Sequence, residues 1–534
     1  MEQNQKYYLF QLVKSLSTAE KGYVKKHSKK TVTNPSYLKL LEAIDRQDNY
    51  DEQRLKKKFR NEKWVKQFSV AKNYLIKVIL KNLRAFHAES SNNIKVHELL
   101  LEIELLYKKR IIGLCERLLH RCKKIVLDCQ LFHHAEELAY WEFKLTVLSP
   151  YNKVMDQKMK AINRFALDGL DAARLLSAYR HLAYEVHRYT FKDGYSRADT
   201  SIQVAHKFSQ HPLLIKPPPE SNAKALGRYW NTWHKVHEIN TDFVQGYKAS
   251  KALVELIQRN PQVFGDTIMS TIIPAYYNLL ACAIVLNQEI IFFNHLAKLQ
   301  QIPELYQNNS RTVQKLSYFY STTLELQFYT HNGHFDLCDA VLERAVNIIE
   351  NEDLKNFGLA IYHVELCYCI AYAYFGKGAY QASDDWVLKT LENEKGNIRQ
   401  DLMCMAHLLH LVNHAELGAF RYLDYKLRNS YNFIKKMEKI HRFERIALEF
   451  LRKLIYLKDS TEFIKLVKMY LQKFRALEND PFERMILMNF DIISYLESKL
   501  KGQVFVKIAK SRRHAKNLAL DQIGDFWTMP KTNN

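Results

Sequence analysis

Glycine and proline are scarce in this chain of 534 residues. It holds 15 Gly and 11 Pro, together about 5% against roughly 12% in average usage. Tight hairpins need both residues in number, so the composition excludes an all-β protein rich in turns. Rossmann and P-loop folds need glycine close to phosphate, which argues against those classes as well. Because 47% of the residues are hydrophobic, the chain can bury a sizeable core, and we predict a mostly helical protein.

Signatures of catalysis are missing too. The sequence has no glycine-rich phosphate loop, no G-x-S-x-G elbow and no kinase motif set. His97-Glu98 and His237-Glu238 begin like a zincin motif but lack its second histidine. We therefore expect no enzyme, no catalytic residue and no cofactor.

The eight cysteines form no C-x-x-C pair, and eight in so long a chain do not make a disulfide framework. Cys115, Cys122 and Cys129 recur every seventh residue, as one helical face would place them. We expect reduced, buried cysteines in a cytoplasmic protein.

No segment has the pattern of a targeting or membrane sequence. The first residues carry Glu2 and Lys14 and lack the apolar core of a signal peptide. The longest uncharged window, 267–288, contains Pro274, and its longest purely apolar run is 279–286. A membrane helix needs about 20 apolar residues, so we expect a buried helix here and no transmembrane segment.

Positive charge is in excess and unevenly distributed. The chain holds 79 Lys and Arg against 57 Asp and Glu, a net charge of +22. Residues 1–90 alone hold 20 cationic and 9 acidic side chains, which is half of the net charge in a sixth of the length. Such asymmetry favours an anionic partner at this end of the molecule.

Residues 1–90 read as a basic helical domain. Ser17 and Glu20 fit a capping box, Asn34-Pro35 starts a helix over 35–46, and further helices are predicted over 51–61 and 65–86. The candidate binding residues are the cations of the last two helices: Lys56, Lys57, Lys58, Arg60, Lys66, Lys77, Lys81 and Arg84.

Three interpretations of these cations stay open. A solvated cationic face is the favoured one. In the second, the two helices form a helix-turn-helix and contact nucleic acid, with lysine binding backbone charge rather than reading bases. An acidic protein or a membrane surface is a further candidate for the same face.

From about residue 94 the chain reads as helix after helix with short breaks. We predict helical repeats over 94–210, a stiff break over 211–222 around Pro217-Pro218-Pro219, and repeats again over 223–534. Other predicted breaks are Ser149-Pro150, Asp193-Gly194, Asn260-Pro261 and Ile302-Pro303. Asp480-Pro481-Phe482-Glu483 carries the cap, proline and capping glutamate of a helix start.

Three segments repeat one pattern around Gly333, Gly378 and Gly418. Each glycine follows an aromatic or imidazole ring by four residues, and an aromatic comes two residues later: Phe335, Tyr380 and Phe420. Twelve residues after the glycines stand the small or moderate side chains Ala345, Thr390 and Ser430. We expect each glycine to end a helix in the left-handed conformation, the aromatic to pack back on that helix, and the small residue to admit the next unit.

These segments resemble the helical hairpins of tetratricopeptide (TPR) repeats, most strongly over about residues 320–435. The spacings of 45 and 40 residues exceed the family's roughly 34, so the helices or loops must be longer. Weaker anchors continue the pattern at Lys109, Ser149, Asp193, Asp242, Gln288, Thr461 and Gly502. The resemblance implies an all-α protein: an α-solenoid of TPR-like hairpins after the basic domain, with a groove for a partner.

Two further segments are candidate binding sites. His407, His410 and His414 share a helical face with Cys404 and could bring two imidazoles to one metal, but no carboxylate or cysteine cluster accompanies them, so packing is the favoured role. In Arg228–Lys235 the stripe of Tyr229 and Trp233 favours a core helix over a surface that stacks bases.

The sequence thus leads to two hypotheses. The first is a non-enzymatic cytoplasmic scaffold or adaptor that binds a protein or peptide in the groove of the repeats. The alternative is a nucleic-acid-binding regulator that uses residues 1–90, with the repeats sensing a partner.

Overall fold

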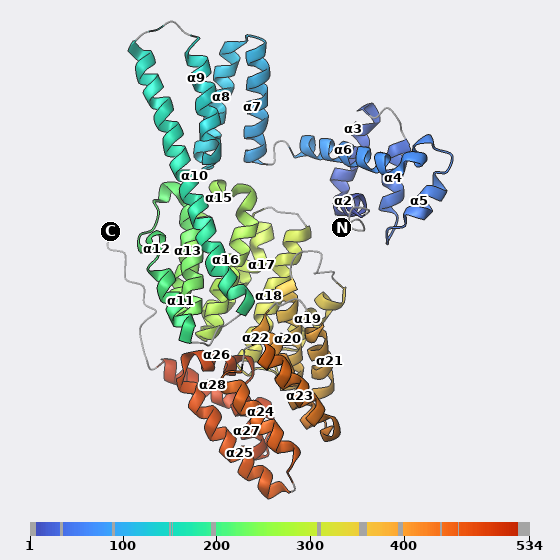
Figure 1. The fold of residues 1–534 in the computed structure, drawn as a ribbon, viewed down its shortest axis with the longest axis vertical. Helices are drawn as coiled ribbons and strands as arrows, with labels where there is room; N and C mark the ends of the chain where they lie inside the picture. The colour runs from blue at the N-terminus through green and yellow to red at the C-terminus, as the bar shows by residue number, and fades with distance from the viewer. Residues whose placement is uncertain are drawn as a thin grey trace. The chain divides into compact units, whose positions relative to one another are not determined.

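Every regular element in the described residues is a helix, and these residues include no strand. The predicted all-α class is therefore confirmed. The computed structural model describes residues 7–31, 36–87, 91–148, 151, 153–193, 199–306, 311–351, 360–392, 399–437, 440–457 and 459–521. They divide into two compact units, unit 1 (Met1–Asp171) and unit 2 (Ala172–Asn534), drawn in Figure 1. The predicted features at Asn34-Pro35 and Ser149-Pro150 lie outside the described residues.

Unit 1 begins with helices that enclose their own hydrophobic core, which includes Leu40, Leu75 and Ile79. Ser17 Oγ accepts from the Glu20 amide and the Glu20 carboxylate accepts from the Ser17 amide, so the predicted capping box is confirmed. The elements are α2 (Tyr8–Ser15), α3 (Thr18–Thr31), α4 (Ser36–Asp45), α5 (Glu52–Lys58), η1 (Lys63–Gln67) and α6 (Phe68–Phe86). The helix predicted from residue 65 starts at Phe68, because residues 63–67 form a 3₁₀ turn.

A second core in unit 1 lies among α7 (Asn92–Lys108), α8 (Ile112–Asp128) and α9 (Ala135–Thr146), with η2 (Phe132–His134) before α9. Cys115, Cys122 and Cys129 are buried in it, as their spacing predicted. All eight cysteines of the chain are free thiols and buried. The long helix α10 (Lys153–Asp193) follows and continues into unit 2.

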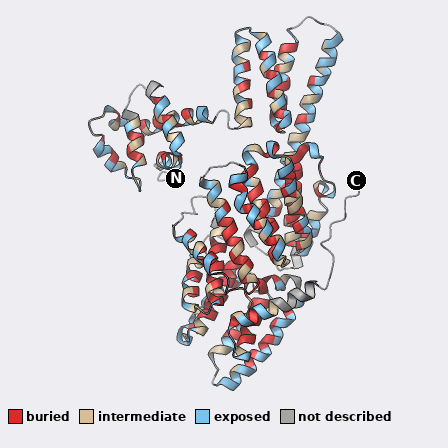
Figure 2. Ribbon diagram, turned by 180° about the vertical axis from the view of Figure 1, so that it is seen from behind, coloured by how far each residue is buried: buried red, intermediate tan, exposed pale blue. Residues whose placement is uncertain are grey.

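Unit 2 is built of helices, and its last helices pack back on earlier ones: Tyr368 Oη donates to Asn489 O, and Phe335 lies against Phe505. Neighbours in the chain pack against each other, and α14, α16, α18, α20, α22 and α24 also contact one another in series. Figure 2 shows buried residues along most of the helices of unit 2. The elements are α11 (Asp199–Ser209), α12 (Pro212–Ile215), η3 (Glu220–Asn222), α13 (Ala223–Ile239), α14 (Phe243–Arg259), α15 (Pro261–Phe264), η4 (Gly265–Thr267), α16 (Ile268–Val285), α17 (Glu289–Leu305), α18 (Arg311–His331), α19 (Asp339–Asn351), α20 (Ala360–Gly376), α21 (Tyr380–Leu391), α22 (Gln400–Glu416), α23 (Phe420–Lys436), α24 (Arg442–Ile455), α25 (Ser460–Arg475), η7 (Ala476–Asn479), α26 (Pro481–Asn489), α27 (Ile492–Lys501) and α28 (Phe505–Asp521).

The three predicted glycine turns have the expected geometry. Gly333, Gly378 and Gly418 have φ of 74°, 75° and 71°, in the left-handed region. After each glycine the next amide bonds back to the carbonyl five residues earlier: to Tyr329 from His334, to Tyr374 from Ala379 and to His414 from Ala419. This is the Schellman ending of a helix, so the prediction for these turns is confirmed.

The same turn recurs without glycine. Thr241 and Asn287 have φ of 56° and 53°, and Arg110 in unit 1 has φ of 60°. Asp242 N bonds to His237 O and Gln288 N to Ala283 O, both at 2.9 Å. The weaker anchors Asp242 and Gln288 were therefore placed one residue after the true left-handed position. A side chain there costs about 1 kcal/mol, which the packed hairpin must offset.

Phe420 corrects one detail of the repeat pattern. Phe335 is 1% exposed and lies against the rings of Tyr372 on α20 and Phe505 on α28, neither of which is the helix that Gly333 ends. Phe420 is 43% exposed, because it begins α23 at the surface of the unit. The predicted packing of this aromatic is wrong in the third hairpin.

Pro303 corrects a predicted break. Helix α17 continues through Ile302-Pro303 to Leu305. Proline cannot donate to the carbonyl four residues earlier, which is that of Leu299. That carbonyl instead accepts a hydrogen bond from Ser317 Oγ at 2.7 Å, so the helix loses no buried partner there.

Glu483 corrects a predicted cap. Asp480 accepts from the amides of Phe482 and Glu483, as expected at the start of α26. The Glu483 carboxylate, however, accepts from the amides of Arg442 and Phe443 at 3.0 and 3.3 Å. It therefore caps the first turn of α24 rather than that of its own helix.

One helical stretch, Pro261–Val285, has the length and apolarity of a membrane span, and 61% of its most apolar window is buried inside the fold. Ile272 and Leu279 in α16 are fully buried. The stretch is part of the hydrophobic core of unit 2.

Candidate functional site

Unit 2 contains a cavity of about 160 Å³ that is lined by both charged and apolar side chains. Its wall is made by α13, α16, α18 and α20, by the start of α22 and by α26. A second cavity of about 280 Å³ shares Phe243, Ile284, Val285 and Met488 with the first. Side chains from helices far apart in the chain thus face one interior space.

A lysine and a glutamate of α13 line the first cavity as a close pair. Lys235 Nζ donates to Glu238 Oε2 at 2.6 Å, and each side chain keeps about a fifth of its surface exposed, 20% and 21%. Burial alone would lower the pKa of Lys235, but the Glu238 charge outweighs it and the pKa is raised. Burial alone would raise the pKa of Glu238, but Lys235 outweighs it and the pKa is lowered. The pair is therefore ionic at neutral pH.

Glu365 on α20 collects three donors in the same cavity. Tyr277 Oη and Gln327 Nε2 donate to its two carboxylate oxygens, both at 2.8 Å, and Arg399 Nη1 lies 3.5 Å away. Arg399 also binds Asp401 with two nitrogens, at 3.0 and 2.9 Å. This network joins α16, α18, α20 and α22.

Two features of the wall of the first cavity lower the stability of the fold. Arg399 has φ of 48°, a left-handed conformation that strains a non-glycine residue. Among the described residues, buried His331 Nδ1 and Asn489 Nδ2 find no hydrogen-bond partner. Strain and unpaired polar groups together are characteristic of functional surfaces.

A cysteine and a serine lie near histidine in this wall without forming an activated nucleophile. His234 Nδ1 is 4.0 Å from Cys282 Sγ and 2.8 Å from Ser250 Oγ. Burial raises the pKa of the Cys282 thiol far above its usual range, with the Glu238 charge adding to the effect. Ser250 is 1% exposed. The geometry therefore supports binding better than covalent chemistry here.

The eight cations predicted from the sequence are all exposed in unit 1. Lys56, Lys57 and Lys58 lie on α5 and Lys66 on η1, while Arg60 lies between these two elements. Lys77, Lys81 and Arg84 follow one another along α6 at helical spacing. Lys56 pairs with Glu52 at 2.8 Å, and no carboxylate among the described residues pairs with the other seven.

Cations make up a larger share of the charged residues in 53–86 than in residues 1–90 as a whole. Residues 53–86 contain eleven Lys or Arg and a single acid, Glu62. Partial burial would raise the pKa of Glu52, but hydrogen bonds from Lys56, Lys72 and Tyr50 outweigh it and lower the pKa to about 2. Glu52 ties α5 to α6 through Lys72 at 2.7 Å and neutralises little of the exposed face.

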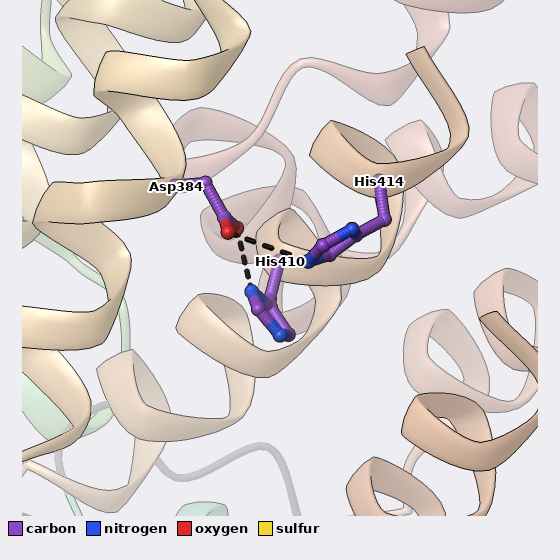
Figure 3. A group of neighbouring side chains, drawn as sticks. All are labelled: Asp384, His410 and His414. Carbon is purple, nitrogen blue, oxygen red and sulfur yellow. Dashed lines mark hydrogen bonds and ion pairs between the residues drawn. The ribbon is translucent and has the colours of Figure 1, made fainter. Parts of the chain in front are cut away.

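The histidines of α22 separate into two groups. His407 faces Ser430 of α23, with 3.2 Å between Nδ1 and Oγ. His410 and His414 turn instead toward Asp384 of α21, as Figure 3 shows. Asp384 was missed from the sequence because it lies 26 residues before His410 and has no motif around it.

Sequence reasoning also missed the cavity. Lys235 lies in the aromatic stretch 228–235 that was assigned to a core helix, and Glu238 follows a histidine in an incomplete zincin motif. The other sequence feature that could have indicated the cavity is the presence of charged residues within apolar helices. In the sequence these residues stand only as isolated polar positions. No protein-family model matches this chain, and no curated protein matches its sequence significantly.

Proposed function

We propose that unit 2 is an α-solenoid of TPR-like hairpins and that the chain is a non-enzymatic, cytoplasmic scaffold or adaptor. The observation that carries the proposal is the cavity lined by α16, α18, α20 and the start of α22, helices that contact one another in series. In a stacked array of hairpins these helices form the inner wall, which is where an extended peptide binds. The recurring Schellman turns support the hairpin repeat, and the free buried cysteines suit a reducing compartment.

The paired charges suggest how such a partner is held. Lys235 with Glu238, and Arg399 with Glu365, offer both signs of charge at fixed positions in a partly desolvated space. A peptide carrying both a cationic and an acidic side chain can exchange partners with these pairs without leaving an unpaired charge. Tyr277, Tyr362 and Tyr368 add rigid apolar surface beside them.

The first prediction is that peptide binding depends on the charged pair of α13. Peptides selected by the wild-type chain from an unbiased displayed library should bind Lys235→Met/Glu238→Gln at least about tenfold more weakly, because both charges are gone. The control Lys473→Met/Glu449→Gln removes an exposed pair of α25 and α24 that is 3.5 Å apart and should leave affinity unchanged. Fluorescence anisotropy measures each Kd. A library that yields no binder, or binders equally tight on the cavity variant, contradicts the proposal.

The exposed cations of α5 and α6 favour a second function, a nucleic-acid-binding regulator. With eleven cations and one acid over residues 53–86, this face suits phosphate contacts without base reading. The repeats would then sense a protein partner.

The second prediction concerns the salt dependence of that binding. The logarithm of the affinity for duplex DNA should fall linearly with the logarithm of salt concentration, by about 0.9 per phosphate contacted. Lys77→Gln/Lys81→Gln/Arg84→Gln should reduce this slope by about two to three. A control with the same loss of charge, Lys435→Gln/Lys436→Gln/Lys468→Gln in unit 2, should leave it unchanged. Equal losses in both variants would mean attraction by net charge alone.

A further inference from the structure

Three side chains of unit 2 that have no part in the cavity point toward one spot. Asp384 comes from α21, and His410 and His414 come from successive turns of α22 (Figure 3). His410 Nδ1 is 2.5 Å from Asp384 Oδ1, and His414 Nε2 is 3.3 Å from Asp384 Oδ2. One ligand atom from each residue lies within 4.8 Å of the others. We propose that Asp384, His410 and His414 bind a divalent metal ion, Zn²⁺ by the chemistry of the set.

The donor set and its spacing suit zinc. Histidines four residues apart on a helix are a common way to bring two imidazoles to one zinc ion, and a carboxylate from a second element completes a three-ligand set. Around a tetrahedral ion with bonds of roughly 2.0–2.2 Å, donor atoms are about 3.3 Å apart. The Asp384–His414 distance already has this value, and the Asp384–His410 distance must open by less than about 1 Å. A fourth position stays free for water.

The two ring nitrogens of His414 provide independent support for a metal site. Both of its ring nitrogens are buried from solvent, and neither makes a hydrogen bond among the described residues. A buried ring N–H without a partner costs about 1–3 kcal/mol. A metal ion on Nε2 gives that nitrogen a directed ligand bond, whereas without metal its contact is with Asp384 Oδ2, 3.3 Å away and not hydrogen-bonded.

The positive charge of Lys426 on α23 opposes binding of a metal cation at this site. Its Nζ donates to His410 Nε2 at 2.7 Å, so in the metal-free chain His410 carries its proton on Nδ1 and donates it to Asp384. Metal binding at Nδ1 displaces this proton and requires a proton on Nε2, which can no longer accept from lysine. Lys426 is half-buried, so its ammonium can turn to solvent. Metal and lysine therefore compete for His410.

The third prediction follows, with full-length chain stripped by chelator and titrated with Zn²⁺ and Co²⁺. We expect one ion per chain by calorimetry and a visible Co²⁺ spectrum of tetrahedral type. Asp384→Asn and His414→Gln should each weaken binding by about tenfold or more. Lys426→Met should tighten it severalfold, because it removes the competing charge. His407→Gln, a histidine of the same helix that faces Ser430, should bind as the wild type does.

The outcomes separate a metal site from a hydrogen-bonded network. In a network without metal, Lys426→Met loses one hydrogen bond and gains no affinity for zinc. Circular dichroism of each stripped variant shows whether it folds, and the wild type and Lys426→Met test the proposal even where a ligand variant does not. No stoichiometric Zn²⁺ or Co²⁺ on the wild-type chain, or equal binding by Asp384→Asn, overturns the proposal.

Discussion

Gly376→Ala should destabilise unit 2 by about 3 kcal/mol, although alanine is normally the better helix residue. Gly376 is the last residue of α20, and a Cβ built there would lie 2.0 Å from Cδ1 of Phe335. The Phe335 ring cannot retreat, because it is 1% exposed and wedged against Tyr372 and Phe505. One of the packed helices must therefore shift.

The control lies two residues further on. Gly378→Ala meets no atom within 4 Å, so its cost is only that of the left-handed φ of 75°, about 1 kcal/mol. Thermal unfolding of the full chain should show a drop in Tm of roughly 5–10 °C for Gly376→Ala and a smaller one for Gly378→Ala. Phe335→Leu in the Gly376→Ala background should recover part of the loss. If Gly376→Ala is as stable as the wild type, the tight packing of α20 on Phe335 is wrong.

Features that depend on neighbours in the chain could be predicted from the sequence. The capping box of Ser17 and Glu20 forms within one helical turn, so its residues are close in the sequence. Gly378 and Gly418 indicate the ends of helices, because glycine is rare in this chain and is favoured at left-handed positions. The turn at Thr241 uses the same backbone hydrogen bonds, which no side chain encodes. Local signals thus gave the helical class and some hairpins and missed others.

Features that depend on distant residues could not be predicted. Glu483 caps a helix that starts about forty residues earlier, because the first turn of α26 lies beside the start of α24. Asp384 meets His410 only after α21 and α22 pack, and Glu365 meets Tyr277 across 88 residues. Exposure, by contrast, follows from charge, and for that reason the cations of α5 and α6 were correctly expected at the surface.

Buried histidines should make unit 2 labile in mild acid. Burial lowers the pKa of His234 and of His407 to about 4, with nearby Lys235 and His410 adding to the respective shifts. Burial likewise lowers the pKa of His295 to about 4, with Lys298 contributing, and that of His331 to about 3. The unfolded chain holds these histidines at about 6.5 and so binds protons first as the pH falls. These four histidines therefore cost no stability above about pH 6.5, and the stability that they cost grows progressively as the pH falls to about 4 and, for His331, to about 3.

The expected size of this loss is about 1–2 kcal/mol for each histidine at pH 5, and several kcal/mol for the four together. His295→Phe/His331→Leu should remove about half of it, because both side chains carry a buried Nδ1 without a partner among the described residues and both lose their ionisable group. Urea unfolding followed by circular dichroism at pH 8, 6 and 5 measures the difference between variant and wild type. The two unfolding midpoints should diverge as the pH falls from 8, where these four histidines are neutral and the difference reports packing alone. A midpoint difference that stays constant from pH 8 to 5 would mean that these imidazoles accept protons as readily in the folded chain as in water, and that the interior of the array is open to solvent.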